Sequence, residues 1–138
     1  MNMKVKLDEG AILPTRAHKA DAGYDLYSPV DMFIRAKGYE TIDTGVHIQI
    51  PEGYVGFLKS KSGLNVKFSV VSEGVIDSGY TGSIRVKLYN HSYRQFKVHK
   101  GNKITQIVFL PIYTPDLEVV EDLEETDRGD NGFGSTGR

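Results

Sequence analysis

Cysteine is absent from this chain of 138 residues. Its absence excludes a disulfide framework, a zinc site built on thiolates and a cysteine nucleophile, and it agrees with a reducing compartment inside the cell. Long apolar runs are absent as well, and the first ten residues, MNMKVKLDEG, have no apolar signal core. The sequence therefore predicts a soluble, cytoplasmic protein with no membrane association.

Neither sign of charge is in clear excess. The chain carries 17 basic and 18 acidic residues, and its formal net charge is −1. A protein that reads nucleic acid usually shows a basic stripe, so we expect no nucleic-acid partner. The length fits one domain, and 39 % hydrophobic and 25 % charged residues are typical of a globular protein.

Helical periodicity is scarce, and short β-rich runs broken by Gly, Pro, Asp and Asn take its place. In one run Ile84, Val86 and Leu88 alternate with polar or charged neighbours, which indicates a strand with one buried face. Only KSGLNV at 61–66 indicates a helical turn. Many short strands at close spacing predict an all-β sandwich or barrel. The predicted strands are 3–7, 24–27, 31–35, 39–43, 46–50, 54–59, 67–71, 83–89, 95–98 and 103–113.

The composition changes near the end of the chain. Residues 117–127, LEVVEDLEETD, are strongly acidic, and residues 128–138, RGDNGFGSTGR, are rich in glycine. We therefore divide the chain into a β domain at 1–127 and a C-terminal arm at 128–138. By composition alone, the arm has too little apolar surface to order by itself.

Asp77 is the first candidate for chemistry. It follows Val75 and Ile76 in GVIDSGYTGS (74–83), where two β-rich runs indicate a hairpin. A carboxylate that is partly desolvated there could accept a proton from water. The alternative is a turn aspartate that caps its own loop. Tyr80 in the same stretch could pack on a ligand ring or simply cover the hairpin.

Two further stretches could face phosphate and metal. SKSGL (60–64) places Lys61 and Ser62 after a strand, where N–H groups and a hydroxyl can hold phosphate, although the Walker spacing is missing. ADAGYDLYSP (20–29) places Asp21 and Asp25 around a turn, and such carboxylates suit Mg²⁺, often through its waters. The alternatives are a plain strand-to-turn junction and turn aspartates without a metal.

Gln106 interrupts the apolar series of GNKITQIVF (101–109), so it faces either a polar network or a ligand. The four histidines, at 18, 47, 91 and 99, are scattered and show no metal-ligand spacing. His47 lies in a predicted strand, and we interpret it as structural.

The arm has its own candidate residues. Phe133 is an isolated aromatic residue among glycines, which allow the backbone to approach a ligand closely. Ser135 and Thr136 add hydroxyl donors, and Arg128 adds a guanidinium that suits phosphate oxygens. The arm could therefore stack on a ring and wrap a phosphate chain if it orders on binding.

The order and spacing of these stretches resemble the trimeric dUTPase (dUTP diphosphatase) family over nearly the whole chain. The five motifs of that family are matched in order by AGYDLYS, KSGL, GVIDSGYTGSI, GNKITQIVF and RGDNGFGSTG. The resemblance implies an all-β, jelly-roll-like β-clip fold and a homotrimer with sites at subunit interfaces, each closed by an arm. It implies Mg²⁺-dependent hydrolysis of dUTP to dUMP and pyrophosphate, which keeps uracil out of DNA and supplies dUMP for dTMP synthesis.

The resemblance also assigns roles on the phosphate side. Asp77 corresponds to the general base for the water that attacks the α-phosphorus. Asp25 corresponds to the aspartate that helps to hold Mg²⁺ through water. The phosphate-binding residues would be Lys61, Ser62, Gly63 and Gln106.

On the nucleoside side, Tyr80 would pack beneath the deoxyribose and leave no room for a 2′-hydroxyl. Backbone groups near Val75, Ile76 and Arg85 would read uracil, and the tight hairpin would exclude the methyl group of thymine. Phe133 would stack on uracil. The γ-phosphate would be held by Arg128, Gly134, Ser135 and Thr136.

Four positions depart from the family pattern. Lys61 stands where arginine is usual, which keeps the charge but loses the bidentate fork, so we expect weaker geometric control of the phosphates. Gly79 and Thr81 replace residues that are usually polar or charged. Asn131 stands where glycine is common, and asparagine tolerates a left-handed backbone better than most residues.

Two alternatives use the same scaffold. One is a dCTP deaminase-like enzyme, which would not need the complete arm that carries phenylalanine. The other is a non-catalytic regulator that binds nucleotide, which would have little reason to keep both Asp25 and Asp77. Release of ammonia from dCTP and of pyrophosphate from dUTP distinguishes the three functions.

Overall fold

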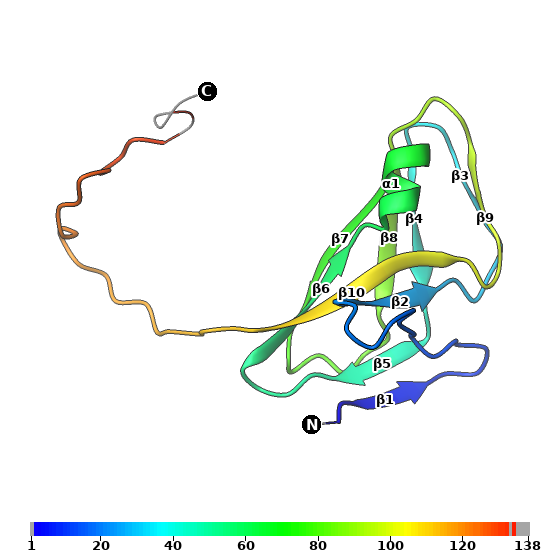
Figure 1. Cartoon of the computed structure of the whole chain (residues 1–138), viewed down its shortest axis with the longest axis horizontal. Coiled ribbons are helices and arrows are strands. Elements are labelled where there is room, and N and C mark those ends of the chain that lie inside the picture. Colours follow the sequence, from blue (N-terminus) through cyan, green and yellow to red (C-terminus); the bar gives the residue numbers. More distant parts are fainter. Residues whose placement is uncertain (1, 133, 135–138) are drawn as a thin grey trace.

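The fold is built almost wholly from strands, as the scarcity of helical periodicity predicts (Figure 1). The computed structural model describes residues 2–132 and 134. The helix α1 spans Ser62–Phe68, and no helix in this described part is long and apolar enough to cross a membrane. The strands are β1 (Lys4–Leu7), β2 (Gly23–Tyr27), β3 (Met32–Ile34), β4 (Tyr39–Asp43), β5 (Val46–Gln49), β6 (Tyr54–Lys59), β7 (Val70–Ile76), β8 (Arg85–Asn90), β9 (Phe96–Val98) and β10 (Lys103–Pro111).

Strand β8 shows why the sequence folds this way. Val86 and Leu88 are fully buried, whereas Arg85 and Tyr89, which flank this pair in the strand, are exposed on the opposite face. Successive side chains of a strand point to opposite faces, so the alternation in the sequence becomes one apolar and one wet face. The predicted half-buried strand is confirmed.

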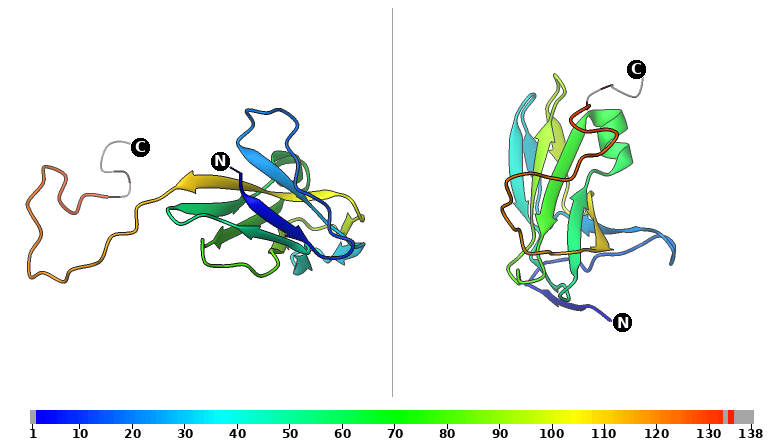
Figure 2. Two further views of the ribbon diagram at one scale, coloured as in Figure 1. Left: turned by 90° about the horizontal axis from the view of Figure 1, so that it is seen from below. Right: turned by 90° about the vertical axis from the view of Figure 1, so that its left-hand side faces the viewer.

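Six strands form one antiparallel sheet in the order β2-β10-β6-β7-β8-β4. Two antiparallel ribbons flank it: β1 pairs with β5, and β3 pairs with β9. The β1–β5 ribbon lies at the end of the molecule opposite α1, and the β3–β9 ribbon lies at the α1 end (Figure 1). The main sheet curls around one interior (Figure 2), so the predicted all-β, jelly-roll-like fold is confirmed.

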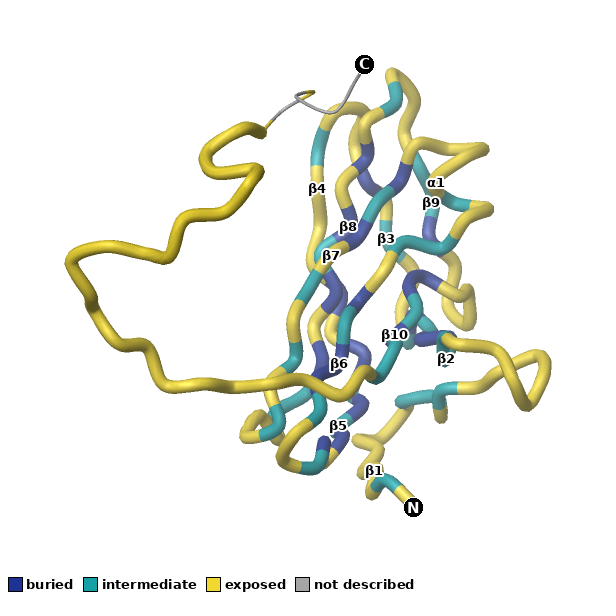
Figure 3. Tube along the Cα trace, turned by 60° about the vertical axis from the view of Figure 1, so that its left-hand side comes forward, coloured by how far each residue is buried: buried dark blue, intermediate teal, exposed yellow. Residues whose placement is uncertain are grey.

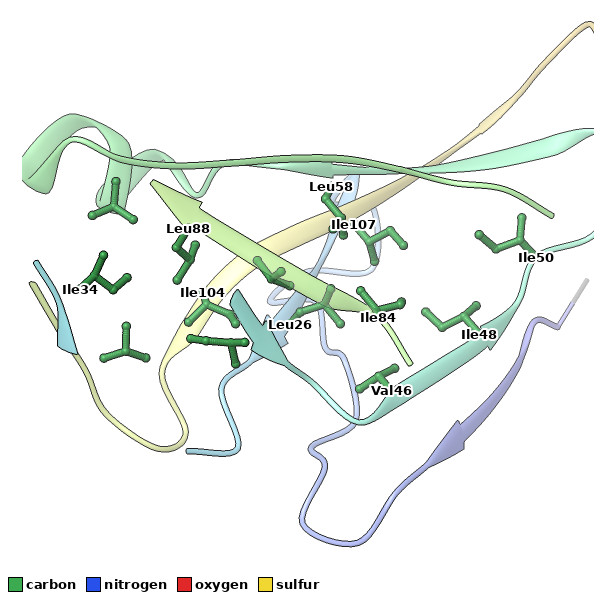
Figure 4. Packing of buried hydrophobic residues seen from close by; sticks show 14 residues of the cluster. Leu26, Ile34, Val46, Ile48, Ile50, Leu58, Ile84, Leu88, Ile104 and Ile107 are labelled. Carbon is green, nitrogen blue, oxygen red and sulfur yellow. The ribbon is translucent and has the colours of Figure 1, made fainter. Parts of the chain in front are cut away.

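One apolar core fills that interior (Figure 4). Leu58 of β6 lies opposite Ile107 of β10, and both side chains are buried. Burial of each such side chain stabilises the fold by roughly 1.5–3 kcal/mol, so the core holds the strands that carry the site. The cluster consists of Leu26, Ile34, Ile42, Val46, Ile48, Ile50, Leu58, Val70, Ile84, Val86, Leu88, Val98, Ile104 and Ile107.

The predicted strand at 67–71 is wrong in its first half. The predicted helical turn extends instead to Phe68 and forms α1. Ser69 then adopts a left-handed conformation with φ of +54°, and its N–H donates to the Asn65 carbonyl at 3.0 Å, which ends the helix. β7 begins at the next residue, Val70, because that side chain is buried in the core.

The chain leaves the folded body after β10. The Ile112 N–H donates to the Gly53 carbonyl at 2.9 Å, next to the last residues of the strand. Residues 113–132 contain no helix or strand, are exposed, and extend away from the sheet (Figures 1 and 3). This segment is therefore positioned by none of the packing that holds the strands.

Candidate active site

Asp25 is the centre of a charged cluster beside the start of α1. This β2 carboxylate is buried, with 6 % of the residue exposed. Lys61 Nζ lies 2.5 Å from its Oδ1, and Lys103 Nζ lies 3.5 Å from its Oδ2. A buried carboxylate needs such partners, because an unpaired charge away from water is strongly disfavoured. The cluster thus offers carboxylate oxygens that suit a cation and ammonium groups that suit phosphates.

Gln106 belongs to the same cluster, since it is the cross-strand partner of Asp25. Its Nε2 donates to the Ser60 carbonyl at 3.1 Å. A Cβ atom at Gly23 would lie only 2.2 Å from Gln106 Oε1, so glycine is required there for the amide to keep its place. Of the two interpretations left open by the sequence, the polar network at the end of β6 is therefore present.

Three hydroxyl groups tie together the strands beneath this cluster. Thr105 Oγ1 donates to the Lys59 carbonyl at 3.0 Å, and Ser72 Oγ lies 2.6 Å from Thr105 Oγ1. Since the Thr105 hydrogen is used for Lys59, Ser72 is the donor in that pair. Ser60 Oγ accepts from the Ser72 N–H at 2.9 Å. These bonds join the end of β6 to β7 and β10, and two of their residues, Ser60 and Thr105, directly precede Lys61 and Gln106 in the chain.

Ser62 and Gly63 follow Lys61 and begin α1, and both are exposed. A Cβ atom added at Gly63 would meet no other atom within 4 Å, so packing within the chain does not require glycine there. The open space lies over the first turn of α1, where backbone N–H groups have no helical acceptor. A phosphate chain would therefore find room and donors at this position.

The second cluster lies where β7 and β8 stop pairing with each other. The two strands pair only over Val70–Ser72 and Leu88–Asn90. Beyond these residues β7 pairs with β6, and β8 pairs with β4, so the two strands diverge toward the turn that connects them. The turn lies where the sequence predicts it, but the ladder of a simple hairpin does not reach it. The facing backbone edges of residues 73–76 and 85–87 therefore make no ladder with each other, and we call this unpaired stretch the slot.

Tyr80 folds over the turn at the end of the slot. Its hydroxyl donates to the Ser83 carbonyl at 2.6 Å, and the side chain remains 43 % exposed in total. A Cβ atom at Gly82 would lie 2.6 Å from the Tyr80 hydroxyl oxygen and 2.7 Å from the ring carbon that bears it. Glycine at this position therefore allows the flat ring to lie against the backbone.

Asp77 follows the last residue of β7 and is exposed. Within residues 2–132 and 134, its carboxylate makes no hydrogen bond or ion pair, so the oxygens are available to water. Val75 is 61 % exposed and Ile76 is half-buried beside the slot. Arg85 begins β8 with an exposed side chain whose Nε lies 3.9 Å from Asp43 Oδ2.

Asp43 anchors the far end of the same turn. Its carboxylate accepts hydrogen bonds from the Ser83 hydroxyl and, at 3.0 Å, from the Gly45 N–H. These two donors, the hydroxyl first, lower the pKa of Asp43 below its ordinary value of 3.8. The turn is thus tied to the β4–β5 connection on this side.

The charged cluster and the slot are far apart within one chain. Through β10, Asp25 is level with Lys59 of β6. Asp77 instead follows Ile76, which pairs with Gly56 near the other end of β6. Strand geometry places the two aspartates about 13 Å apart along the strands and about 14 Å apart across them. The structure therefore does not bring Asp77 to the charged cluster of its own chain.

The arm is described only in part. Arg128 Nε donates to the Asn131 carbonyl at 2.7 Å, and the Asn131 N–H donates to the Arg128 carbonyl at 3.1 Å. In the described part of the arm, the left-handed residues are Gly129 and Gly134, and Asn131 is not one of them. The predicted contacts of Phe133, Ser135 and Thr136 lie outside the described residues.

Comparison with known proteins places this geometry in a family. The family model named dUTPase matches residues 9–137, a range that includes all five motifs. The chain belongs to the dUTPase family. Deoxyuridine 5'-triphosphate nucleotidohydrolase of Arabidopsis thaliana is 47 % identical over 133 residues, which cover 96 % of this chain and 80 % of that relative.

Solved dUTPase structures have the same fold. The Staphylococcus bacteriophage 80alpha dUTPase with dUPNHPP has a TM-score of 0.94 and 35 % identity, and the match covers 99 % of each chain. A mutant dUTPase from phage phi11 of S. aureus, described with a structural Mg(II) ion, has a TM-score of 0.85 and 33 % identity. That match covers 91 % of this chain and 100 % of the phage protein.

Sequence reasoning does not identify every residue of the site in this dUTPase. Lys103, the second cation beside Asp25, lies within the fourth motif, but nothing in the sequence shows that β10 runs next to β2. Ser72 and Thr105 are buried polar residues within apolar strands. A polar residue at a core position is a signal of a hydrogen-bond network, but it does not show which partners that network has.

Proposed function

We propose that this chain hydrolyses dUTP to dUMP and pyrophosphate, with a water molecule attacking the α-phosphorus. The observation that carries the proposal is the slot between β7 and β8, with Asp77 directly after its β7 edge. A slot bordered by backbone donors and acceptors suits a flat base, and an available carboxylate beside it suits a general base. The 80alpha relative, whose structure is with dUPNHPP, supports the choice of nucleotide.

Backbone groups of the slot would select uracil. Donors and acceptors near Val75, Ile76 and Arg85 would pair with its edge, as a complementary base does. Cytosine would leave one of these polar groups unpaired, and such a loss discriminates strongly in a buried site. Tyr80 would lie beneath the deoxyribose, where its ring would leave no space for a 2′-hydroxyl.

Asp77 would orient the attacking water and take its proton. A general base must lie within hydrogen-bond reach of that water, and an exposed carboxylate without a protein partner meets this condition. As the water oxygen bonds to the α-phosphorus, the bond to the bridging oxygen breaks and pyrophosphate leaves. Lys61 and Lys103 would offset the negative charge on the departing phosphates.

The charged cluster fits Mg²⁺ as cofactor. Across residues 2–132 and 134 no three acidic or histidine side chains gather into a metal cage. That suits Mg²⁺, which keeps several waters and is held by one or two carboxylates together with substrate phosphates. Asp25 would hold it through a bound water, and the ion would neutralise charge on the triphosphate. The phosphate chain itself would be held by Lys61, Ser62, Gly63 and Gln106.

We propose a homotrimer with its sites between subunits. One nucleotide needs Asp77 near its α-phosphorus and Asp25 near the metal on the same phosphate chain. The separation of the two aspartates within one chain supports a site in which a second copy supplies the charged cluster. We also propose that the enzyme acts in the cytoplasm, as its sequence predicts.

The arm at 128–138 would close over the assembled site. Residues 113–132 are exposed and extend away from their own body, which supports an arm that reaches a neighbouring site. Phe133 would stack on uracil. The γ-phosphate would be held by Arg128, Gly134, Ser135 and Thr136.

Pyrophosphate release from dUTP, dTTP, dCTP and UTP, with and without Mg²⁺, tests the proposed function. We expect Mg²⁺-dependent turnover of dUTP in preference to the other three nucleotides. Asp77→Asn should lower kcat by about 10²- to 10⁴-fold and leave nucleotide binding nearly intact. Ammonia release from dCTP would point to a deaminase instead. Binding of dUTP without turnover by the unmodified protein would point to a regulator.

A further inference from the structure

His47 of β5 bridges two loops of the chain. Its Nδ1 lies 2.8 Å from the Thr81 carbonyl oxygen, and its Nε2 lies 3.0 Å from Asp8 Oδ1. Thr81 belongs to the turn that joins β7 to β8, directly after Tyr80. Asp8 follows β1, and its N–H donates to the Gly45 carbonyl at 2.9 Å, which holds it against the body. The imidazole therefore links the turn of the slot to a fixed point.

Both partners of the imidazole are acceptors. A carbonyl oxygen and a carboxylate cannot donate, so each ring nitrogen must carry a hydrogen for both bonds to form. Only the imidazolium has two such hydrogens, and neutral His47 has to give up one bond. The bridge is therefore complete only when His47 is protonated.

The groups around His47 also favour its protonated form. The Thr81 carbonyl, first, and the Asp8 carboxylate raise the pKa of His47 above its ordinary value of 6.5. Asp43 lies close enough for its charge to interact with His47 as well. Lys6, the cross-strand neighbour in β1, opposes this effect. The acceptors outweigh the lysine, so the net shift of the His47 pKa is upward and the imidazolium form is favoured.

Packing does little to hold the turn on this side. An open groove of about 620 Å³ separates Ser78, Gly79 and Thr81 from the β1–β5 ribbon. Besides the Thr81 carbonyl, the described part of the turn is tied to the body at its last two residues. The Ser83 hydroxyl donates to Asp43 and accepts from the Gly45 N–H, and Ile84 bonds to Thr44 and Val46. Loss of the Thr81 tie therefore leaves Asp77 and Tyr80 on a turn whose described bonds to the body all lie beyond Gly82.

We propose that His47, in its protonated form, is a positioning residue that fixes the turn carrying Asp77 and Tyr80. The proposal rests on the proposed function, because it assumes that this turn binds the nucleotide. His47 touches neither substrate nor the reacting atoms and acts through the Thr81 carbonyl. Since the bridge weakens as the pH rises through the pKa of His47, the fit of the site to dUTP weakens with it.

Three variants test the bridge. His47→Asn keeps a neutral donor that can reach Thr81 in place of Nδ1, His47→Phe has no donor, and Asp8→Asn removes the charge that favours the imidazolium. His91→Asn is the matched control, because His91 lies after the far end of β8.

In the full-length protein, we expect KM for dUTP to rise with pH through the His47 midpoint, with little change in kcat. His47→Phe should raise KM by about fivefold at pH 6. His47→Asn should restore most of that loss and show no pH-dependent rise, and His91→Asn should match the unmodified protein.

Titration of the His47 ring by NMR measures the bridge without turnover. We expect a midpoint above 6.5 that falls in Asp8→Asn and is unaffected by His91→Asn. A midpoint at or below 6.5, or an unchanged pH profile in both His47 variants, would overturn the proposal. Absence of dUTP turnover together with the raised midpoint would refute the proposed function and leave the bridge itself established. Should His47→Phe fail to fold, Asp8→Asn and His47→Asn still decide the question.

Discussion

At the scale of single residues, two glycines determine where site side chains lie. Gly23 leaves room for the Gln106 amide, and Gly82 leaves room for the Tyr80 ring. In each case the Cβ of any other residue would fall closer than 3 Å to the side chain it faces. These glycines therefore act on the site by the space that they leave, although neither has a functional group.

Gly82→Ala tests this at the slot. The added methyl group should push the Tyr80 ring away from the backbone, because the ring cannot approach it as closely. We expect kcat/KM for dUTP to fall by about 10- to 100-fold, and discrimination against UTP to fall as well. Steady-state kinetics with both nucleotides measure the two effects.

Gly79→Ala is the matched control, because a Cβ atom there meets no atom within 4 Å. It should behave like the unmodified protein. Equal kinetics for the two alanine variants would show that the position of the Tyr80 ring does not depend on Gly82.

At the scale of strands, the hydroxyl chain through Thr105 joins β6, β7 and β10. Thr105→Val keeps the shape of the side chain but leaves the Lys59 carbonyl and the Ser72 hydroxyl without their partner. We expect the free energy of unfolding to fall by about 1–3 kcal/mol, measured by urea denaturation. Thr41→Val, at an exposed position of β4, should change it by less than about 0.5 kcal/mol. A similar small change at Thr105 would contradict a structural role for the chain.

Strand β10 shows why the sequence predicts elements better than their contacts. The pairing of β10 with β2 shifts between Lys103 and Thr105, so Ile104 and Thr105 are both buried in succession. Simple alternation would turn one of the two outward, and a bulge of this kind has no clear signal here. The apolar content of this segment predicts the strand, but it does not predict that the Thr105 side chain points into the core.

In the candidate site, too, the sequence predicts residues better than it predicts their contacts. Asp25, Lys61 and Gln106 were singled out from local chemistry, and the structure brings them together. Their proximity results from the order β2-β10-β6, which joins segments that are remote in sequence. The sequence predicts the helix at 62–68 only as a turn, because its seven residues offer just Leu64 and Phe68 at helical spacing, and of these Leu64 packs against the core. Periodicity cannot identify so short a helix.

At the scale of the whole molecule, the net charge differs between the body of strands and the segment that follows β10. Residues 112–138 contain eight acidic and two basic residues, whereas residues 1–111 contain 15 basic and 10 acidic residues. In the proposed trimer, the acidic segment would be attracted to the positive body of a neighbouring copy as well as to its own, although salt screens such exposed charges.

Removal of residues 128–138 tests the role of the arm. The core lies entirely before residue 112, so the melting temperature should change by less than about 2 °C. We expect kcat/KM for dUTP to fall by about 100-fold, because the contacts proposed for Phe133 and Arg128 are lost. Thermal melts and steady-state kinetics measure the two quantities. Unchanged kinetics would mean that the arm takes no part in the reaction.

Mixed assemblies test whether each site combines two copies. Asp25→Asn and Asp77→Asn should each be inactive alone. Unfolded together in equal amounts and refolded, they should recover about one quarter of the unmodified activity, because in a random trimer that share of sites receives both intact aspartates. Each variant refolded alone is the control. A mixture without activity would indicate a site within one chain.

The slot has a mechanical consequence. Its two edges belong to different parts of the six-stranded sheet: β2-β10-β6-β7 on one side and β8-β4 on the other. Ladder hydrogen bonds join these two parts only between Val70–Ser72 and Leu88–Asn90. The two parts of the sheet are therefore joined at one end of the slot and not at the other. A base whose edge forms hydrogen bonds with both sides would replace the missing ladder hydrogen bonds and make the two parts move as one stiff sheet.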